Sequence, residues 1–419
     1  MRKTAFLAVG IACLVAVAPA AQKQKRVMGP SQLFSIERSD AALAAIIDPH
    51  VKIESLGGPF GLTEGSTWVP EDSSGYLVVS DLTANAIYRV EGNGAKSVLL
   101  DTSGATVLDL QGRLIWVAAN DGTLMRMEKD GTRKVLAAGF NGKRFDPAND
   151  VAVRSDGTVF LIEGRADSRR DAISLAAETP HGALYAVMGA GDEVVAEDPK
   201  GKKSRRSLRD RKVSAAGNNA KDGGAESTEQ KNGTGGEGNQ GMEQKSGRGG
   251  ERRDGKDGKG GKSSVAGEVR QLLTAEELGG YPTGIALSPD EKVLYVGTGG
   301  KKVNRYEVHD DGTLGPAALF AEDAMGGFAA GMKTDRAGNL YSTNGSAGPG
   351  IVRVTSPAGK LLGRLHLPVF GAQPKRHICA THVTFGNLDG KTLFVTACEA
   401  VYKVRLKSAG PVPGIVIRH

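Results

Sequence analysis

The sequence has few of the residues from which metal, redox and nucleophilic sites are commonly built. Its 419 residues include 3 cysteines and 7 histidines. It contains no HExxH pair, no CxxC pair and no GxSxG motif. These absences exclude the usual zinc-protease, thiol–disulfide and serine-hydrolase signatures. Only His377 and His382 form a close pair, and a histidine beside a strand start is more often packed or solvated than a ligand.

The chain also has no apolar run long enough to span a bilayer, which takes about 20 residues. A basic start is followed by an apolar run over Ala5–Val17 and by small residues from Ala18 to Ala21. This order predicts a secretory signal peptide over residues 1–21. We therefore expect a secreted or periplasmic protein without a membrane span, and Cys13 would leave with the peptide.

Two cysteines then remain, Cys379 and Cys398. A hairpin turn centred between Leu388 and Asp389 would place them opposite each other on neighbouring strands. In an oxidising compartment such a pair can form a disulfide. Two buried free thiols are the alternative that the sequence leaves open.

Large apolar residues are almost missing from residues 199–264. Within this segment, residues 200–262 hold 17 Lys/Arg and 9 Asp/Glu, which accounts for the net charge of +7 of the chain. Such a composition cannot bury enough apolar surface to fold, so it predicts a disordered insertion. It is either an electrostatic tether to an anionic polysaccharide or membrane surface, or a tolerated low-complexity expansion. The remaining chain is not basic, so we expect no nucleic-acid groove.

What the chain does contain is a repeated cassette of a short strand, a Gly/Asp turn and an apolar strand. Six copies begin at corresponding positions, which are Glu64, Gly104, Asn149, Thr283, Ala330 and Thr381. Repeats roughly 40–50 residues long are typical of propeller blades, because one blade cannot bury both faces of its sheet alone. We predict an all-β, six-bladed β-propeller built from residues 51–198 and 265–419. A lead-in over residues 22–50 precedes it, with one short helix over Asp40–Ile47. A β-sandwich with coincidental turn spacing is the alternative.

In such a propeller the six cassette starts form a ring around the mouth of the central channel. A ring of inward-pointing residues is where a metal or a small ligand binds. The sequence around these positions resembles that of the senescence-marker-protein/gluconolactonase (regucalcin-like) family of six-bladed propellers. The matching motifs are Glu64-Gly65-Ser66-Thr67-Trp68, Gly142-Lys143-Arg144, Pro147-Ala148-Asn149-Asp150 and Ser288-Pro289-Asp290-Glu291. The resemblance covers nearly the whole mature chain except the insertion.

The resemblance implies one divalent cation, usually calcium, at the channel mouth. Glu64 and Asn149 would be both ligands and catalytic residues, and Thr283 occupies a third ligand position. Calcium prefers such carboxylate and carbonyl oxygens, and it would polarise a lactone carbonyl and activate a water. Arg144, Asp150 and His382 are expected to contact the substrate.

The chain departs from the family pattern at two ligand positions. Thr283-Gly284 stands where the family has Asn-Gly, and Ala330 stands where it has an aspartate. The ring therefore keeps one carboxylate, and calcium affinity follows the charge of the ligands. We expect a weakened metal site, with Glu163 considered as a substitute carboxylate.

Three functions fit these observations. The first is a secreted, gluconolactonase-like hydrolase of a lactone or ester that uses a weakened divalent-metal site. The second is a catalytically inactive propeller that binds a sugar-like ligand or a partner. The third is a metal-independent enzyme similar to the strictosidine-synthase-like propellers, with Glu64 as its general acid or base. The first two differ in activity, and the first and third differ in metal dependence.

Overall fold

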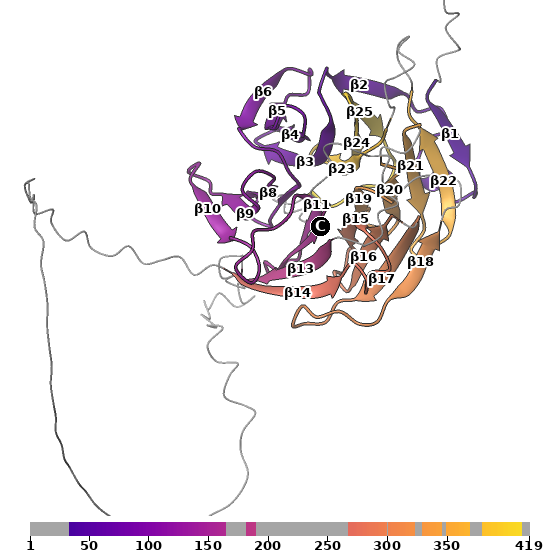
Figure 1. Ribbon diagram of the computed structural model, residues 1–419. Coiled ribbons are helices and arrows are strands. Elements are labelled where there is room, and N and C mark those ends of the chain that lie inside the picture. The colour runs from indigo at the N-terminus through magenta and orange to yellow at the C-terminus, as the bar shows by residue number, and fades with distance from the viewer. Residues whose placement is uncertain are drawn as a thin grey trace, which may run out of the picture.

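The computed structural model describes residues 33–164, 182–189, 267–299, 301–322, 329–345, 349–368 and 379–412. Six sheets surround a central channel in it (Figure 1). This arrangement confirms the predicted six-bladed β-propeller. The predicted signal peptide over residues 1–21 and the predicted insertion over residues 199–264 both lie outside the described residues.

The strands within each blade are antiparallel and follow the chain from the channel outward. Blade one holds β3 (Thr63–Glu71), β4 (Ser74–Asp81), β5 (Ala86–Val90) and β6 (Lys96–Leu100). Blade two holds β7 (Thr106–Leu108), β8 (Leu114–Ala118), β9 (Thr123–Met127) and β10 (Arg133–Ala137). Blade three holds β11 (Ala148–Val153), β12 (Val159–Glu163), β13 (Ala183–Met188) and β14 (Glu268–Thr274). Blade four holds β15 (Pro282–Leu287), β16 (Val293–Thr298), β17 (Lys302–Glu307) and β18 (Ala318–Glu322).

The last two blades also take strands from the N-terminal side of the chain. Blade five holds β19 (Met332–Thr334), β20 (Leu340–Thr343), β21 (Ile351–Thr355) and β22 (Leu361–His366), and its outer edge pairs with β1 (Ser35–Arg38). Blade six holds β23 (His382–Gly386), β24 (Thr392–Ala397) and β25 (Ala400–Arg405), and its fourth strand is β2 (Ile53–Gly57). Because β2 comes from the other end of the chain, this pairing closes the ring. Helix α1 (Leu43–Ile46) lies between β1 and β2, inside the predicted helical segment.

The hydrophobic core lies between neighbouring blades rather than in one centre. Trp68 of blade one stacks on Phe394 of blade six with ring centroids 5.3 Å apart. Tyr341 of blade five meets Phe385 of blade six edge-on at 5.1 Å. Neighbouring blades cover the two faces of a blade in this way. Its inner strands are therefore apolar runs in the sequence. Truncating such an aromatic to alanine costs about 3–5 kcal/mol of stability.

The segment predicted as an insertion connects two strands that are direct neighbours. Met188, the last residue of β13, pairs with Glu268, the first residue of β14. The chain between these strands therefore leaves and re-enters blade three at one place on its outer edge. A connection of this kind can lengthen at little thermodynamic cost, because loop-closure entropy grows slowly with loop length.

The register predicted for the last hairpin is wrong by one residue. His382 pairs with Thr396, and Gly386 pairs with Thr392, so the turn centres on Asp389. Cys379 and Cys398 lie just outside this ladder, with Cα atoms 5.5 Å apart, and are joined by a disulfide. A distance of that size is common for disulfide-bonded cysteines.

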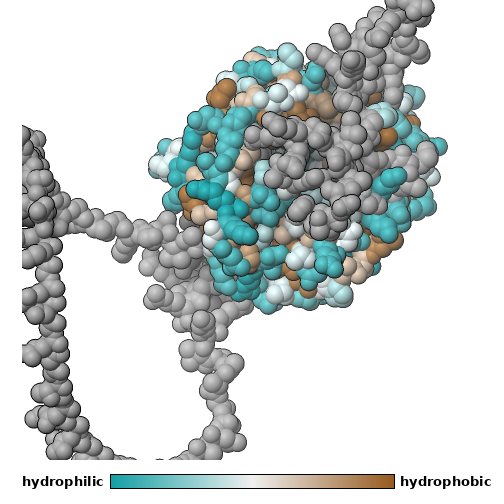
Figure 2. Space-filling model, in the orientation of Figure 1, coloured by the Kyte–Doolittle hydropathy of each residue, from teal (hydrophilic) through white to brown (hydrophobic). Residues whose placement is uncertain are grey.

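No helix of the described chain is long and apolar enough to cross a membrane. On the face seen in Figure 2, hydrophilic residues cover much of the described surface and hydrophobic ones are scattered among them. Scattered apolar surface residues are ordinary in folded proteins. The features that need a chemical explanation lie inside the channel.

Candidate functional site in the central channel

Three inner strands carry a β-bulge close to their first residue. The pairing shifts between Glu64 and Ser66 in β3, between Ala148 and Asp150 in β11, and between Pro282 and Gly284 in β15. A bulge breaks the strict alternation of side chains and re-aims them, and bulges are frequent beside active sites. The three predicted ligand positions, Glu64, Asn149 and Thr283, all lie at these bulges. We call this end of the channel, where the inner strands begin, the mouth.

Glu64 supplies a carboxyl group at the mouth, and the pKa of this group is unusually high. The residue is only partly exposed, and its carboxyl group is surrounded by protein. Burial first, and the negative charge of Asp150 second, raise the pKa of Glu64 to about 8. Burial disfavours the charged form, and a nearby like charge adds to this effect. At neutral pH the group is mainly protonated, and it ionises within the range in which acid–base catalysts work.

Asn149 is held by two hydrogen bonds from its amide nitrogen to blade four. Its Nδ2 donates to the Tyr281 hydroxyl at 3.0 Å and to the Pro282 carbonyl at 2.9 Å. A carbonyl can only accept, which fixes the orientation of the amide. The Oδ1 atom is left to accept a hydrogen bond. It lies close to Gly164, where a Cβ atom would come within 2.5 Å of it.

The other two ring positions offer little to a cation. The Thr283 hydroxyl donates to the Ala329 carbonyl at 2.7 Å, and Ala330 has only a methyl group. Among the described residues, no three acidic, histidine or cysteine side chains converge on one point. Calcium takes 6–8 oxygen ligands. With one carboxylate and one amide oxygen at the mouth, the described residues do not fit a preformed calcium site.

Below the mouth, Asp150 and His382 meet across the channel. The two residues belong to blades three and six, which stand on opposite sides of the ring, and His382 Nε2 lies 3.3 Å from Asp150 Oδ1. Asp150 also accepts the backbone N–H of Ile285 in blade four at 3.1 Å. Lys333 of blade five places its Nζ 3.7 Å from the same carboxylate. We call this group the cross-channel tie, because one carboxylate connects four blades.

The protonation of this tie follows from its contacts. The Ser66 N–H lies 3.2 Å from His382 Nδ1, so Nδ1 is the accepting nitrogen and Nε2–H donates to Asp150. Burial lowers the pKa of His382 below its usual value, which keeps the ring neutral. Burial alone would raise the pKa of Asp150, but Lys333 and His382 outweigh it and hold the pKa below the usual range.

Together with Ser66, the tie has the Ser–His–Asp sequence of contacts found in a serine-hydrolase triad, but its residues are not accessible to a substrate. Ser66 Oγ lies 3.2 Å from His382 Nδ1, and His382 continues to Asp150. However, Ser66 is 0% exposed, and His382 and Asp150 are 1% exposed each. A nucleophile must reach a substrate carbonyl, so this Ser66 hydroxyl is a structural partner of the imidazole. The predicted substrate contacts Asp150 and His382 likewise lie below the surface of the mouth.

Gly331 allows this packing. A Cβ atom on Gly331 would lie 2.3 Å from Cδ2 of His382 and 2.6 Å from its Cα. These are distances that real side chains do not adopt. The absence of a side chain in blade five therefore gives the His382 imidazole its place in blade six.

The remaining predicted residues lie apart from the tie. Arg144 is exposed on the loop that leads into β11, and its guanidinium donates to the Asp121 carbonyl at 2.5 Å. Glu163 accepts the Asp146 N–H and the Tyr185 hydroxyl, both at 3.0 Å. Its contacts are thus within blade three and the loop before it, and it does not replace the missing ring carboxylate.

Sequence reasoning missed Lys333 and Ser66. Lys333 is the middle residue of β19, between Met332 and Thr334, whose exposed fractions are 0% and 4%. A lysine inside an inner propeller strand was the available signal, because lysine is rarely buried without a partner. Ser66 had no comparable signal, since serine is common at strand starts.

The sequence profile of the family described as "SMP-30/Gluconolactonase/LRE-like region" matches residues 62–205 and 237–399. The chain is also 24% identical to the gluconolactonase of Zymomonas mobilis over 97% of each protein. Its fold is similar to that of a gluconolactonase from Xanthomonas campestris, with a TM-score of 0.57, 22% identity and coverage of 91% of this chain and 99% of that one. It is also similar to a calcium-binding protein, regucalcin, from Agrobacterium tumefaciens, with a TM-score of 0.51, 15% identity and coverage of 85% and 93%. The solved structures support the fold, and the profile match over most of the chain shows that the protein belongs to the SMP-30/gluconolactonase/LRE-like family.

Proposed function

We propose that the protein hydrolyses a lactone, or a closely related ester, at the mouth of the channel. The observation that carries this proposal is the position of Glu64 at the bulge of β3, in a chain of the gluconolactonase family. The other carboxylate at these bulges, Asp150, is 1% exposed and is held by His382 and Lys333 in the cross-channel tie. The raised pKa of Glu64, about 8, supports a role as a general base.

In the proposed reaction the ionised Glu64 carboxylate takes a proton from a water molecule. The water oxygen attacks the lactone carbonyl carbon and forms a tetrahedral intermediate. Collapse of the intermediate breaks the bond to the ring oxygen, which receives the proton back from Glu64. Lactone and water together give one hydroxy acid, and the enzyme ends as it began. General acid–base catalysis of this kind contributes typically 10²–10⁴-fold.

Asn149 and Arg144 would orient the substrate rather than take part in proton transfer. Both N–H bonds of the Asn149 amide are used by Tyr281 and Pro282, so its oxygen is suited to a substrate hydroxyl. A polyhydroxylated lactone supplies such hydroxyls. Arg144 is exposed on the loop before β11, where its charge would attract the carboxylate of the product. This arrangement favours a sugar-derived lactone over an apolar ester.

The test is hydrolysis of glucono-1,5-lactone and of an aryl ester by the full chain, measured above the uncatalysed rate. We expect Glu64→Gln to lower kcat/KM by about 100-fold or more, since the general base is lost. Glu163→Gln is the matched control, because it also removes a buried carboxylate while keeping side-chain length and polarity. We expect its activity to stay within about twofold of the wild type.

Each reaction is run with chelator and with added calcium. Activity that survives the chelator supports the metal-free mechanism. Activity that appears only with calcium would show that groups outside the described residues complete a cation site, and would overturn the mechanism. A wild-type protein inactive under both conditions would contradict the hydrolase proposal and leave a binding propeller. Export through residues 1–21 is a separate proposal, tested by whether that segment directs a reporter enzyme out of the cytoplasm.

A further inference from the structure

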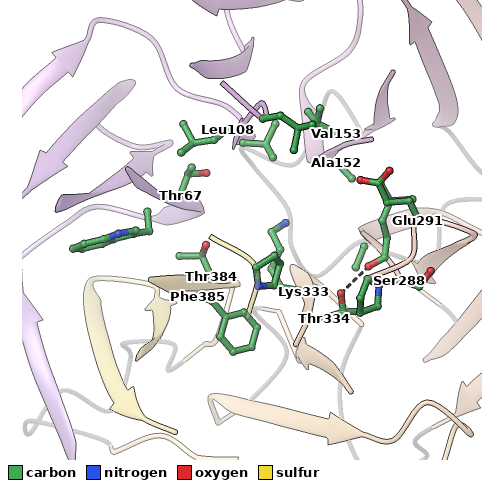
Figure 3. A pocket seen from close by; sticks show the side chains of 17 residues that line it. Thr67, Leu108, Ala152, Val153, Ser288, Glu291, Lys333, Thr334, Thr384 and Phe385 are labelled. Atoms are coloured by element: carbon green, nitrogen blue, oxygen red, sulfur yellow. Dashed lines mark hydrogen bonds between the residues drawn. The ribbon is translucent and has the colours of Figure 1, made fainter. Parts of the chain in front are cut away.

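A cavity lies at the end of the channel away from Glu64. Its volume is about 190 Å³, and the later residues of all six inner strands line it. Each blade supplies one residue at the same level, and these are Thr67, Val107, Ala152, Ala286, Lys333 and Thr384. Figure 3 shows four members of this ring, Thr67, Ala152, Lys333 and Thr384, around an open centre. We call it the lower cavity.

The Asp150–His382 pair of the cross-channel tie stands between the lower cavity and the mouth. Asp150 precedes Ala152 on β11 by two residues, and His382 precedes Thr384 on β23 by two residues. At about 3.3 Å per residue the Asp150–His382 pair lies roughly 7 Å above the cavity lining, and Lys333 reaches from the lining up to this pair. Because the tie spans the channel and its Asp150 and His382 are 1% exposed each, a molecule in the lower cavity does not touch Glu64. The lower cavity is therefore a separate site.

One positive charge faces this cavity. The Lys333 side chain is 20% exposed, and its Nζ lies 3.7 Å from Asp150 Oδ1. In Figure 3 the Lys333 chain extends toward the middle of the ring. An ammonium group has three N–H bonds, and within the tie it faces only the Asp150 carboxylate. The remaining donors are available to an anion in the cavity.

The rest of the lining is mainly apolar. Leu108, Val153, Leu287 and Phe385 surround the cavity from four different blades. The Thr334 hydroxyl donates to the Leu287 carbonyl at 2.7 Å and is thus occupied. The carboxylate of Glu291 also lines the site but is held by the Ser155 N–H at 2.9 Å. Its negative charge disfavours a ligand with a second acidic group.

Size and chemistry together select one class of ligand. A cavity of about 150 Å³ is large enough for benzene, so the lower cavity admits a body of about that size and excludes a sugar chain or a nucleotide. We propose that the lower cavity binds a small monocarboxylate with an apolar body, its carboxylate on the Lys333 ammonium and its body among the side chains of Leu108, Val153, Leu287 and Phe385. A neutral polyol has no charge to pair with the Lys333 ammonium, and a dicarboxylate is repelled by Glu291.

Benzoate is the probe, and benzyl alcohol is its uncharged match. Binding to the full chain is measured by titration calorimetry and by ligand-observed NMR. We expect benzoate to bind at least about 10-fold more tightly than benzyl alcohol, because a hydrogen bond to a charged group is worth about 1.5–3 kcal/mol. Lys333→Met, which keeps an unbranched apolar chain, should weaken benzoate by a similar factor and leave benzyl alcohol almost unchanged.

Two more variants separate this site from the mouth and from a folding defect. Val107→Phe fills part of the lower cavity and keeps the Lys333 residue, and it should abolish binding of both probes. Glu64→Gln changes the mouth and should leave benzoate affinity unchanged, whatever it does to hydrolysis. Thermal unfolding confirms that each variant is folded. The proposal is overturned if the two probes bind equally, if neither binds at about 10 mM, or if the Lys333 and Val107 variants bind benzoate like the wild type.

Discussion

Asn149 and Asp150 are neighbours in sequence but serve different parts of the molecule. The bulge in β11 allows both side chains to act near the channel, although neighbours on a regular strand point to opposite faces. Asn149 fixes its amide on blade four, and its free oxygen stays at the mouth. Asp150 lies one level deeper and holds the cross-channel tie. The pair therefore joins a candidate substrate contact to the groups that keep the channel shut.

The cross-channel tie predicts that replacing Asp150 lowers the stability of the fold. In Asp150→Asn the Lys333 ammonium loses its counter-charge in a largely buried setting. Breaking a buried pair by removing one partner costs about 3–5 kcal/mol, and we expect a loss near the lower value because Lys333 is partly exposed. The measurement is chemical denaturation of the full chain.

The double variant Asp150→Asn/Lys333→Met is the control for that prediction. It removes the second charge as well, so it should recover part of the lost stability. A double-mutant cycle then gives the coupling between the two residues. Additive losses from the two single changes would show that the 3.7 Å contact contributes nothing to the fold.

The raised pKa of Glu64 predicts a pH-dependent difference in stability. Its folded-state pKa is about 8, against an ordinary value of 4.5. The folded protein keeps the proton when the unfolded chain has released it, so the stability that this group contributes falls as pH rises from about 4.5 to 8. Glutamine cannot ionise. The Tm of Glu64→Gln minus that of the wild type should therefore increase between pH 5 and pH 9, by roughly 3 °C or more.

Both proteins share every other titrating group, so these contributions cancel in the difference. The comparison is made in chelator and repeated with calcium, which would lower the pKa of Glu64 if it bound there. An unchanged difference across the pH range in chelator would contradict the environment described for Glu64.

At the scale of single elements, the sequence predicted the strands that recur in each blade. It did not predict the side-chain contacts that connect different blades. The cassettes identified the inner strands, because turn residues and apolar runs recur in every blade. The contact of Lys333 with Asp150 was not predictable, since it links blades five and three through the channel. The register of the last hairpin failed for a local reason. Its turn covers five residues, and Asn387 and Gly390 there have positive φ angles of 60° and 68°, so the centre moved to Asp389.

The connection between β13 and β14 predicts tolerance to deletion. Met188 and Glu268 are paired neighbours, so a short turn can join these strands. We expect that replacing residues 199–264 by a short Gly/Ser turn changes the Tm by less than about 2 °C, because long loops add little closure cost. Differential scanning calorimetry of both proteins gives the answer. A fall of many degrees would show that the segment packs on the propeller.

At the scale of the whole molecule, stability depends on how the ring is closed. Blade six takes three strands from the C-terminal part of the chain and β2 from the N-terminal part. The Leu56 and Val401 side chains of this blade are 5% and 0% exposed, and they join the cluster that packs blade six on blade one. If blade six opens, both of its interfaces are lost together. Features that stabilise this blade should therefore stabilise the entire propeller.

The disulfide between Cys379 and Cys398 is such a feature, since it joins the segment before β23 to the residue that follows β24. The two cysteines are 19 residues apart in sequence, and closing a loop of that size stabilises a fold by about 3 kcal/mol. We expect Cys379→Ser/Cys398→Ser to unfold at lower temperature in one cooperative step, because blade six belongs to both ends of the ring. Reductant should shift the wild type toward the variant and leave the variant unchanged. Alkylation followed by mass spectrometry provides the independent check. Two thiols that react in the folded, unreduced protein would show that the bond does not form.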